Sequence, residues 1–222
     1  RKGSAAAAER MFRATVEWRR STGANHILSD PGARKVWDAV RPLYAASPVM
    51  FTAEGNLVVY FKMAEFLGIW KSGIGEEELR TFYISWMENM LALQNEGRSR
   101  LGHGPDREMP ACIEVYDLRG VGLRHLRCLP GLRMMMRILK LGQDHYPENL
   151  HTAIFLNVPT LANTPLNMVR RVLDVRTQAK LRCTWDSGHS LLGMILKVGP
   201  EELLKRFHTT PGTKLLKEVA LG

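Results

Sequence analysis

The most informative part of the chain is residues 144–180, which read DHYPENLHTAIFLNVPTLANTPLNMVRRVLDVRTQAK. The motif Tyr-Pro-Glu at residues 146–148 ends a helical pattern, because a residue that precedes proline is disfavoured in a helix. Residues 152–158 then form a mostly apolar run that a proline closes, and such a run predicts a buried strand. The chain therefore passes from a helix into a buried strand within a few residues.

A short amphipathic helix is predicted directly after this strand, over residues 165–173. Thr177 and Lys180 follow it and stand just before a further apolar run. Together with Glu148, they place an acid, a hydroxyl and a base near the mouth of whatever the short helix covers.

The rest of the chain repeats this alternation of strands and helices. Strands are expected over residues 57–61, 112–118, 152–158 and 181–185. Helices are expected over residues 5–20, 75–95, 126–144, 188–197, 200–207 and 214–219. Because long helical segments separate the strands, the pattern predicts an α/β fold with a mainly parallel, mixed sheet flanked by helices. Residues 30–56 contain several prolines and are expected to be irregular.

A length of 222 residues fits one domain preceded by a helical region. Residues 1–45 are expected to form that helical region, truncated because the chain starts at Arg1 and not at a methionine, and residues 46–222 the main domain. The hydrophobic fraction of 45% is enough for a large core. No apolar run approaches the roughly 18 residues that a membrane span requires, and no signal peptide is visible.

The charge balance is basic, with 31 Lys and Arg against 22 Asp and Glu and a net charge of +9. Such a balance suggests an anionic partner, either nucleic acid or an acidic membrane leaflet, or it serves solubility alone. No nucleic-acid-binding motif is present, so a membrane surface is expected and nucleic acid is not. Cys112, Cys128 and Cys183 lie far apart and outside any CxxC pair, which indicates thiols in a reducing compartment.

No catalytic constellation is visible in the sequence. A phosphate-binding loop would need GxGxxG or GxxxxGK followed by Ser or Thr, a hydrolase elbow would need GxSxG, and none of these occurs. Asp186, Ser187 and His189 cluster, but sequence neighbours seldom assemble a triad, and the start of a helix explains them better. The histidines show no metal-ligand spacing. The chain is therefore expected to be neither an enzyme nor the holder of a metal or cofactor.

A series of short motifs occurs in an order that resembles a known family. They read AERMFRATVEWRR at residues 8–20, NLVVYF at 56–61, VYDLRG at 115–120, YPEN at 146–149 and NVP at 157–159, followed by Leu173-Asp174, Thr177 and Lys180. This succession resembles the CRAL-TRIO lipid-binding domain, the family of the yeast phosphatidylinositol/phosphatidylcholine transfer protein. The resemblance spans nearly the whole chain.

The resemblance implies a hydrophobic pocket closed by a mobile gate helix, which here is the helix over residues 165–173. Glu148 matches the glutamate of the family's YPE motif. Thr177 and Lys180 match residues that contact the inositol phosphate headgroup in phosphatidylinositol-binding members. Tyr60 matches a tyrosine that faces the phosphocholine site. From the residues alone, Glu148 and Lys180 could instead cap helices or form an internal ion pair.

Five apolar residues are expected to line the pocket around the acyl chains: Phe82, Trp86, Met135, Ile154 and Phe155. On the gate helix, one apolar face is expected to hold Leu166, Val169, Val172 and Leu173, with Arg170 and Arg171 directed to another side. An apolar edge beside arginines suits an anionic membrane, where each basic residue contributes about 1 kcal/mol. A plain core and a solvated basic face would show the same two patterns.

The expected function is that of a soluble, monomeric lipid-transfer protein at the cytoplasmic surface of membranes. It would take one phospholipid, phosphatidylinositol, into a gated pocket and exchange or present it. Two alternatives remain open at this point, a carrier of another hydrophobic ligand of the isoprenoid, tocopherol or retinal type, and a lipid-sensing module of a larger signalling protein.

Overall fold

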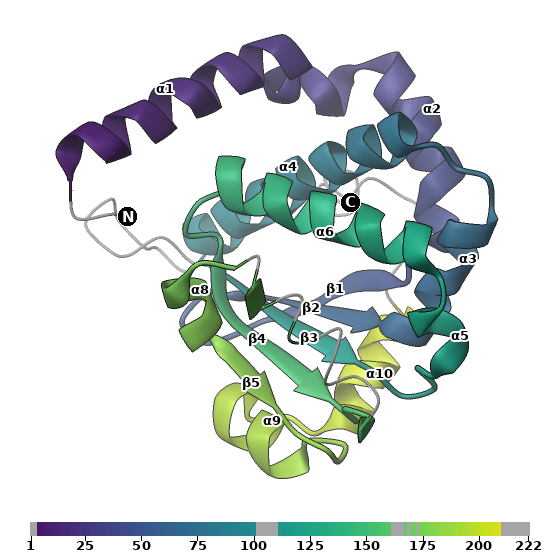
Figure 1. Cartoon of the computed structure of the whole chain (residues 1–222). Helices are drawn as coiled ribbons and strands as arrows, with labels where there is room; N and C mark the ends of the chain where they lie inside the picture. Colours follow the sequence, from purple (N-terminus) through teal and green to yellow (C-terminus); the bar gives the residue numbers. More distant parts are fainter. Residues whose placement is uncertain (1–3, 101–110, 161–166, 168–169, 172, 210–222) are drawn as a thin grey trace.

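The computed structural model describes residues 4–100, 111–160, 167, 170–171 and 173–209 (Figure 1). Within these residues the chain builds a five-stranded sheet in the order β1-β2-β3-β4-β5. The strands are β1 (Ala46–Phe51), β2 (Leu57–Lys62), β3 (Cys112–Asp117), β4 (Leu150–Leu156) and β5 (Leu181–Cys183). β1 and β2 form an antiparallel hairpin, and the other neighbours are parallel. The predicted α/β fold with a mainly parallel, mixed sheet is confirmed.

Helices cover both faces of this sheet (Figure 1). α4 (Glu76–Arg100) and α6 (Leu129–His145) lie over one face, and α9 (His189–Leu196) and α10 (Pro200–Thr209) lie over the other. The shorter helices are α3 (Leu67–Lys71), α5 (Leu123–Leu126) and α8 (Val175–Ala179), with 3-10 turns at Ala24–Ser29, Arg41–Leu43 and Met63–Phe66. No helix of the described part of the chain is both long and apolar enough to cross a membrane.

Successive side chains of a strand point to opposite faces of the sheet, and β2 shows the consequence. Leu57, Val59 and Phe61 pack on the face that α4 and α6 cover. Val58 and Tyr60 pack on the other face, beneath α9 and α10. The sheet therefore separates two apolar layers that share no side chains.

Residues 31–43 and 46–51 are regular, so the expectation of an irregular segment was wrong over most of residues 30–56. Asp30 caps α2 (Pro31–Val40), where its Oδ1 accepts a hydrogen bond from the Ala33 backbone N–H at 2.6 Å. A proline at the first helical position favours this start, because that position needs no N–H donor. Pro48 lies in β1, which tolerates it because β1 is an edge strand. Prolines that suggested breaks instead mark a helix start and a sheet edge.

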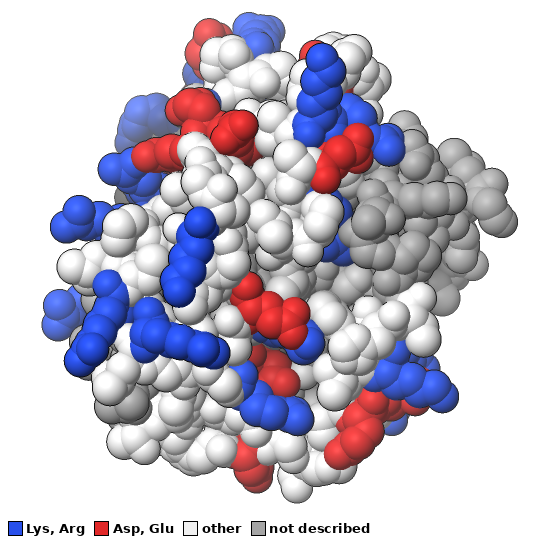
Figure 2. Space-filling view, turned by 90° about the vertical axis from the view of Figure 1, so that its right-hand side faces the viewer, with Lys and Arg blue, Asp and Glu red and all other residues white. Residues whose placement is uncertain are grey.

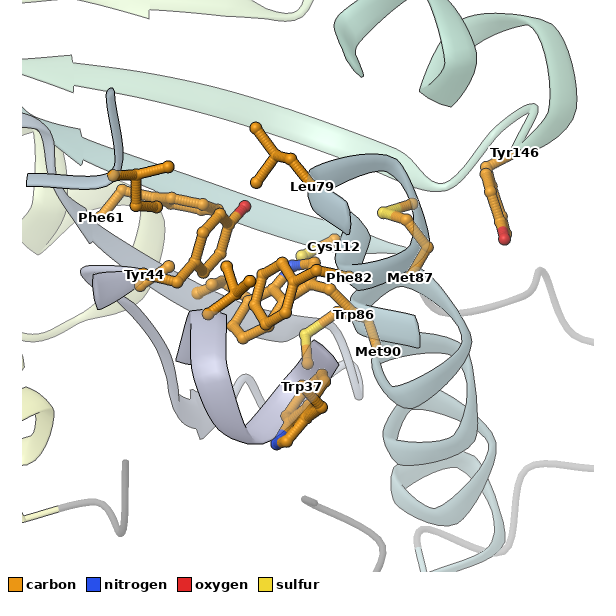
Figure 3. Packing of buried hydrophobic residues seen from close by; sticks show 14 of the residues in the cluster. Trp37, Tyr44, Phe61, Leu79, Phe82, Trp86, Met87, Met90, Cys112 and Tyr146 are labelled. Atoms are coloured by element: carbon orange, nitrogen blue, oxygen red, sulfur yellow. The ribbon is translucent and has the colours of Figure 1, made fainter. Parts of the chain in front are cut away.

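The helical N-terminal region packs firmly against the rest of the molecule. The helix α1 (Ala5–Thr22) ends at Gly23, whose φ of +65° suits glycine. The ring of Trp18 stacks on His145 at 4.1 Å, and Arg19 donates two hydrogen bonds to Glu88, at 2.8 and 3.0 Å. α2 contributes Trp37 to an aromatic cluster with α4, shown in Figure 3. The predicted helix over 214–219 lies outside the described residues.

Candidate functional site

A cavity of about 280 Å³ lies between the sheet and helices α3, α4 and α6. Its walls are mostly apolar and come from all these elements. They include Phe61, Trp70, Tyr83, Trp86, Leu139 and Phe155. Cavities of this kind hold ligands whose apolar part is large and whose polar contacts are few.

The position of α6 explains why the space beneath it is hollow. Gly131 is the buried residue of α6, and a side-chain Cβ there would lie 2.2 Å from the ring of Trp70. The helix can thus approach α3 closely at its N-terminal end. Further along, Met135 and Leu139 are only half-buried and face the cavity. α6 therefore packs closely on α3 at its N-terminal end and on α1 at its C-terminal end, and it roofs the cavity between them.

Glu148, Thr177 and Lys180 come together at the edge of this cavity. Lys180 Nζ lies 3.5 Å from Glu148 Oε2 and donates a hydrogen bond to the Leu150 carbonyl oxygen at 2.5 Å. Thr177 Oγ1 donates to Asp174 Oδ2 at 2.8 Å. The structure thus brings together the acid, the hydroxyl and the base that the sequence indicated.

The Glu148–Lys180 ion pair is open to solvent, since the two side chains are 65% and 30% exposed. Ion pairs at such exposure stabilise a fold by only about 0–1 kcal/mol. Lys180 could therefore exchange Glu148 for the phosphate of a ligand at little cost in stability. Of the alternatives left open for Glu148 and Lys180, the structure shows the ion pair.

Asn149 adds a polar group that sequence reasoning did not single out. It lines the cavity beside Glu148, and its Oδ1 is buried with no hydrogen-bond partner among the described residues. A buried polar atom without a partner is uncommon and costs stability unless something satisfies it. The oxygen is thus an acceptor to which no described residue donates a hydrogen bond. Its only signal in the sequence was its place in the YPEN motif.

Three of the five residues expected around the acyl chains line the cavity, and two do not. Trp86, Met135 and Phe155 line the cavity. Phe82 does not, because it is fully buried in the cluster between α2 and α4 (Figure 3). Ile154 packs on the opposite face with Leu192, because strand alternation turns it away from its neighbour Phe155. The prediction that Phe82 and Ile154 line the cavity was therefore wrong.

Tyr60 also lies on the far face, so the expectation that it faces the headgroup is wrong. Its hydroxyl donates to Asp117 Oδ2 at 2.7 Å, and burial together with the nearby Asp117 raises the pKa of Tyr60. Asp117 Oδ1 accepts further bonds from Asn157 Nδ2 at 2.8 Å and the Arg119 backbone N–H at 2.9 Å. The VYDLRG and NVP motifs thus meet in a buried network that joins the ends of β2, β3 and β4.

The expected gate helix is described only in part. Leu173 lines the cavity, and Arg170 and Arg171 are helical and exposed. The other three residues of its apolar face lie outside the described residues: Leu166, Val169 and Val172.

A mainly parallel sheet that floors an apolar cavity, with ionic groups at one edge, defines a protein that encloses an amphipathic ligand. The family model described as the CRAL/TRIO domain matches residues 48–208. The chain belongs to this lipid-binding and lipid-transfer family.

Individual relatives agree with this assignment. Patellin-6 of Arabidopsis thaliana is 28% identical over 177 residues, which cover 77% of this chain and 39% of Patellin-6. A CRAL-TRIO domain-containing protein of Caenorhabditis elegans is 23% identical over 214 residues, covering 91% of this chain and 27% of that protein. The crystal structure of Sfh5 shares the fold with a TM-score of 0.65 at 16% identity, over 87% of this chain and 65% of that one. The chain spans less than half the length of the two curated relatives.

Proposed function

We propose that the protein takes one molecule of phosphatidylinositol from a membrane into its cavity and exchanges or presents it at another membrane. The observation that carries this proposal is the meeting of Glu148, Thr177 and Lys180 at one edge of an otherwise mostly apolar cavity. A phosphoinositide has the same division, with an anionic, hydroxyl-rich headgroup on two apolar chains.

The chemistry of the rim matches the headgroup part by part. The Lys180 ammonium carries the charge that a phosphate requires, and the Thr177 hydroxyl can turn to donate a hydrogen bond to it. The Glu148 carboxylate and the buried Asn149 Oδ1 are acceptors, which suits the hydroxyl groups of an inositol ring. A choline headgroup offers no hydrogen-bond donor to these two acceptors.

The size of the free energies involved indicates that the headgroup, and not the acyl chains, sets the selectivity among lipids. Two acyl chains carry roughly 30 methylenes, each worth about 0.8 kcal/mol on leaving water. A bilayer already supplies this free energy, so moving the chains into the cavity is close to neutral. The cavity must widen to admit both chains, and the flexible Met135 suits that adjustment. We place the movable cover at residues 165–173, which would open against the membrane.

The charge distribution favours contact with an anionic membrane. Between Asp117 and Asp144 the sequence has six Lys and Arg and no acid. At the lower left of the view in Figure 2, basic side chains gather without acidic ones among them. This is the side on which α5 and the start of α6 lie. Arg170 and Arg171 are exposed beside Leu173, which lines the cavity. The protein would act as a monomer at the cytoplasmic surface of membranes, with these arginines toward the lipid.

Lipid capture tests the proposal directly. The purified protein is incubated with mixed vesicles and re-isolated, and its bound lipid is identified by mass spectrometry. Phosphatidylinositol should be enriched over phosphatidylcholine, and Lys180→Ala should reduce its occupancy about tenfold. The matched control is Lys205→Ala on α10, an exposed lysine on the other side of the sheet. Wild-type occupancy in Lys180→Ala would refute the headgroup assignment.

A further inference from the structure

A carboxyl group stands in the floor of the cavity, apart from the ionic rim. Glu114 lies on β3, and its side chain shares the cavity face with Cys112 and Tyr116. In the sheet it pairs with Ala153 of β4, whereas Lys180 precedes β5, one strand further away. Glu114 is shielded from bulk water, and the surface it keeps opens into the cavity. None of the headgroup contacts proposed above uses it.

One phenol hydroxyl is hydrogen-bonded to this carboxyl group, and two further tyrosines line the same cavity. Tyr116 Oη donates a hydrogen bond to Glu114 Oε2 at 2.6 Å. Tyr44 and Tyr83 also line the cavity, and the charge of Glu114 contributes, after burial, to raising the pKa of each of them. No ion pair of the described residues includes Glu114. A carboxyl group has two oxygens that can form hydrogen bonds, and the bond from Tyr116 uses only Oε2.

An apolar chain that covers Glu114 would displace water from its carboxyl group and would offer no hydrogen bond in exchange. Burying a polar group without a hydrogen-bond partner is unfavourable, and burying its charge is more so. A ligand that brings its own donor to this point avoids the loss. Glu114 therefore favours ligands that carry a polar group above the middle of the sheet over ligands that are apolar there.

We propose that Glu114 forms a second polar subsite, which binds the hydroxyl group of ligands that have a long apolar body and no phosphate. The protein would then carry a second class of ligand, long-chain alcohols in the broad sense, in the same cavity. This step rests on the lipid-binding cavity and not on phosphatidylinositol as its ligand.

The surroundings favour a hydroxyl over an ammonium group. Burial raises the pKa of Glu114, and the opposing effect of the Tyr116 hydrogen bond is smaller. A neutral carboxyl group both donates and accepts, and so does a hydroxyl group, so the two can satisfy each other. A cationic ligand would instead need an ionised carboxylate, which burial beside the apolar walls disfavours.

Three probes with the same apolar chain test the subsite: hexadecanol, its methyl ether and hexadecylamine. Each is titrated at pH 7 against a fluorescent fatty probe bound in the cavity of the whole chain. Hexadecanol should bind about tenfold more tightly than the ether, although the ether is the more apolar molecule. Equal affinities, or no competition by any of the three, would overturn the proposal. Tighter binding of hexadecylamine would replace it with a cation site.

Variants assign the preference to Glu114 itself. Glu114→Leu should abolish the tenfold preference, whereas Glu114→Gln, which keeps a donor and an acceptor, should retain most of it. Met194→Leu changes an exposed residue of α9, on the other side of the sheet, and should leave the preference intact. A preference that survives in folded Glu114→Leu contradicts the assignment. If that variant does not fold, the comparison of alcohol and ether on the wild-type protein still decides.

Lys180→Ala separates this proposal from the proposed function. The alcohol and the ether carry no phosphate, so their affinity ratio should be unchanged in that variant. Phosphatidylinositol could therefore prove not to bind while the alcohol preference holds, or the reverse, and the two results would be read independently.

Discussion

The two faces of the sheet contrast sharply although they share the same strands. On one face Ile154, Leu192 and Leu203 are completely buried, and α9 and α10 fill the space with side chains. On the other, α6 roofs a cavity whose wall residues are largely half-buried. Alternate side chains of β2 and β4 serve the two purposes. Rigid packing is thus concentrated on one side, and the capacity to hold a ligand on the other.

Substitution of one leucine on each face tests the difference between the two faces most directly. Leu192 on α9 is completely buried, whereas Leu139 on α6 is half-buried and lines the cavity. Leu192→Ala should lower the free energy of unfolding by about 3 kcal/mol, because it leaves a void in a filled layer. Leu139→Ala should cost about 1 kcal/mol, because a void already lies beside it. Urea denaturation measures both, and equal losses would mean that the cavity face is packed as tightly as the other.

Charge reversal tests which face meets the membrane. Arg170→Glu with Arg171→Glu should slow lipid exchange with acidic vesicles on the order of tenfold, since each basic residue near such a surface contributes about 1 kcal/mol. Exchange with neutral vesicles should change much less. Reversal of Lys197 and Lys205, both exposed on the filled side, is the control and should have little effect. Equal slowing with both kinds of vesicle would exclude attraction to the acidic surface.

Tyr60→Phe tests whether a hydroxyl group on the filled face contributes to stability without contributing to lipid binding. The change removes the bond to Asp117 Oδ2 and should lower the free energy of unfolding by about 1–2 kcal/mol. Lipid occupancy, measured by mass spectrometry of the captured lipid, should stay at the wild-type level because Tyr60 lies across the sheet from the cavity. Reduced occupancy at unchanged stability would return Tyr60 to the ligand site.

The pH dependence of the free energy of unfolding should report the burial of Glu114 on the cavity face. Burial raises the pKa of Glu114 in the folded protein above its usual value of 4.5. A carboxyl group with a raised pKa contributes stability below its unfolded pKa, and that contribution is lost as the pH rises through the folded pKa. Glu114→Gln should therefore become progressively more stable than wild type as the pH increases above about 4.5, until the difference levels off.

The same groups around Glu114 should not obscure this measurement. Burial raises the pKa of Tyr116 and of Cys112 well above their ordinary values, so neither loses its proton in the acid range. Denaturation of both proteins at a series of pH values would give the difference. A difference that is flat or that falls with rising pH would show that Glu114 ionises readily in the folded protein.

Local patterns predicted most elements and the rim of the site. The strand runs and the YPE break gave β2, β3, β4 and β5, and the family motifs drew attention to Glu148, Thr177 and Lys180. α2 and β1 were missed because a proline has the same local signature in a helix start, an edge strand and a loop. Only the neighbours of Pro31 and Pro48, which lie elsewhere in the chain, distinguish these cases.

The errors at Tyr60 and Ile154 have a common cause. A strand's alternation sorts its side chains into two sets, but when both faces are buried both sets are apolar. Nothing local says which set faces a cavity. The same ambiguity concealed Glu114, whose place beside Tyr116 on one face follows from the period of two, while its position under α6 does not.

The order and type of most elements, the family and the residues that form the ionic rim were determined by the sequence alone, because they depend on neighbours along the chain. Which face of the sheet is hollow was decided only by the tertiary structure. That choice depends on how closely α6, α9 and α10 approach the strands, and contacts such as Gly131 against Trp70 set those distances between residues far apart in the chain.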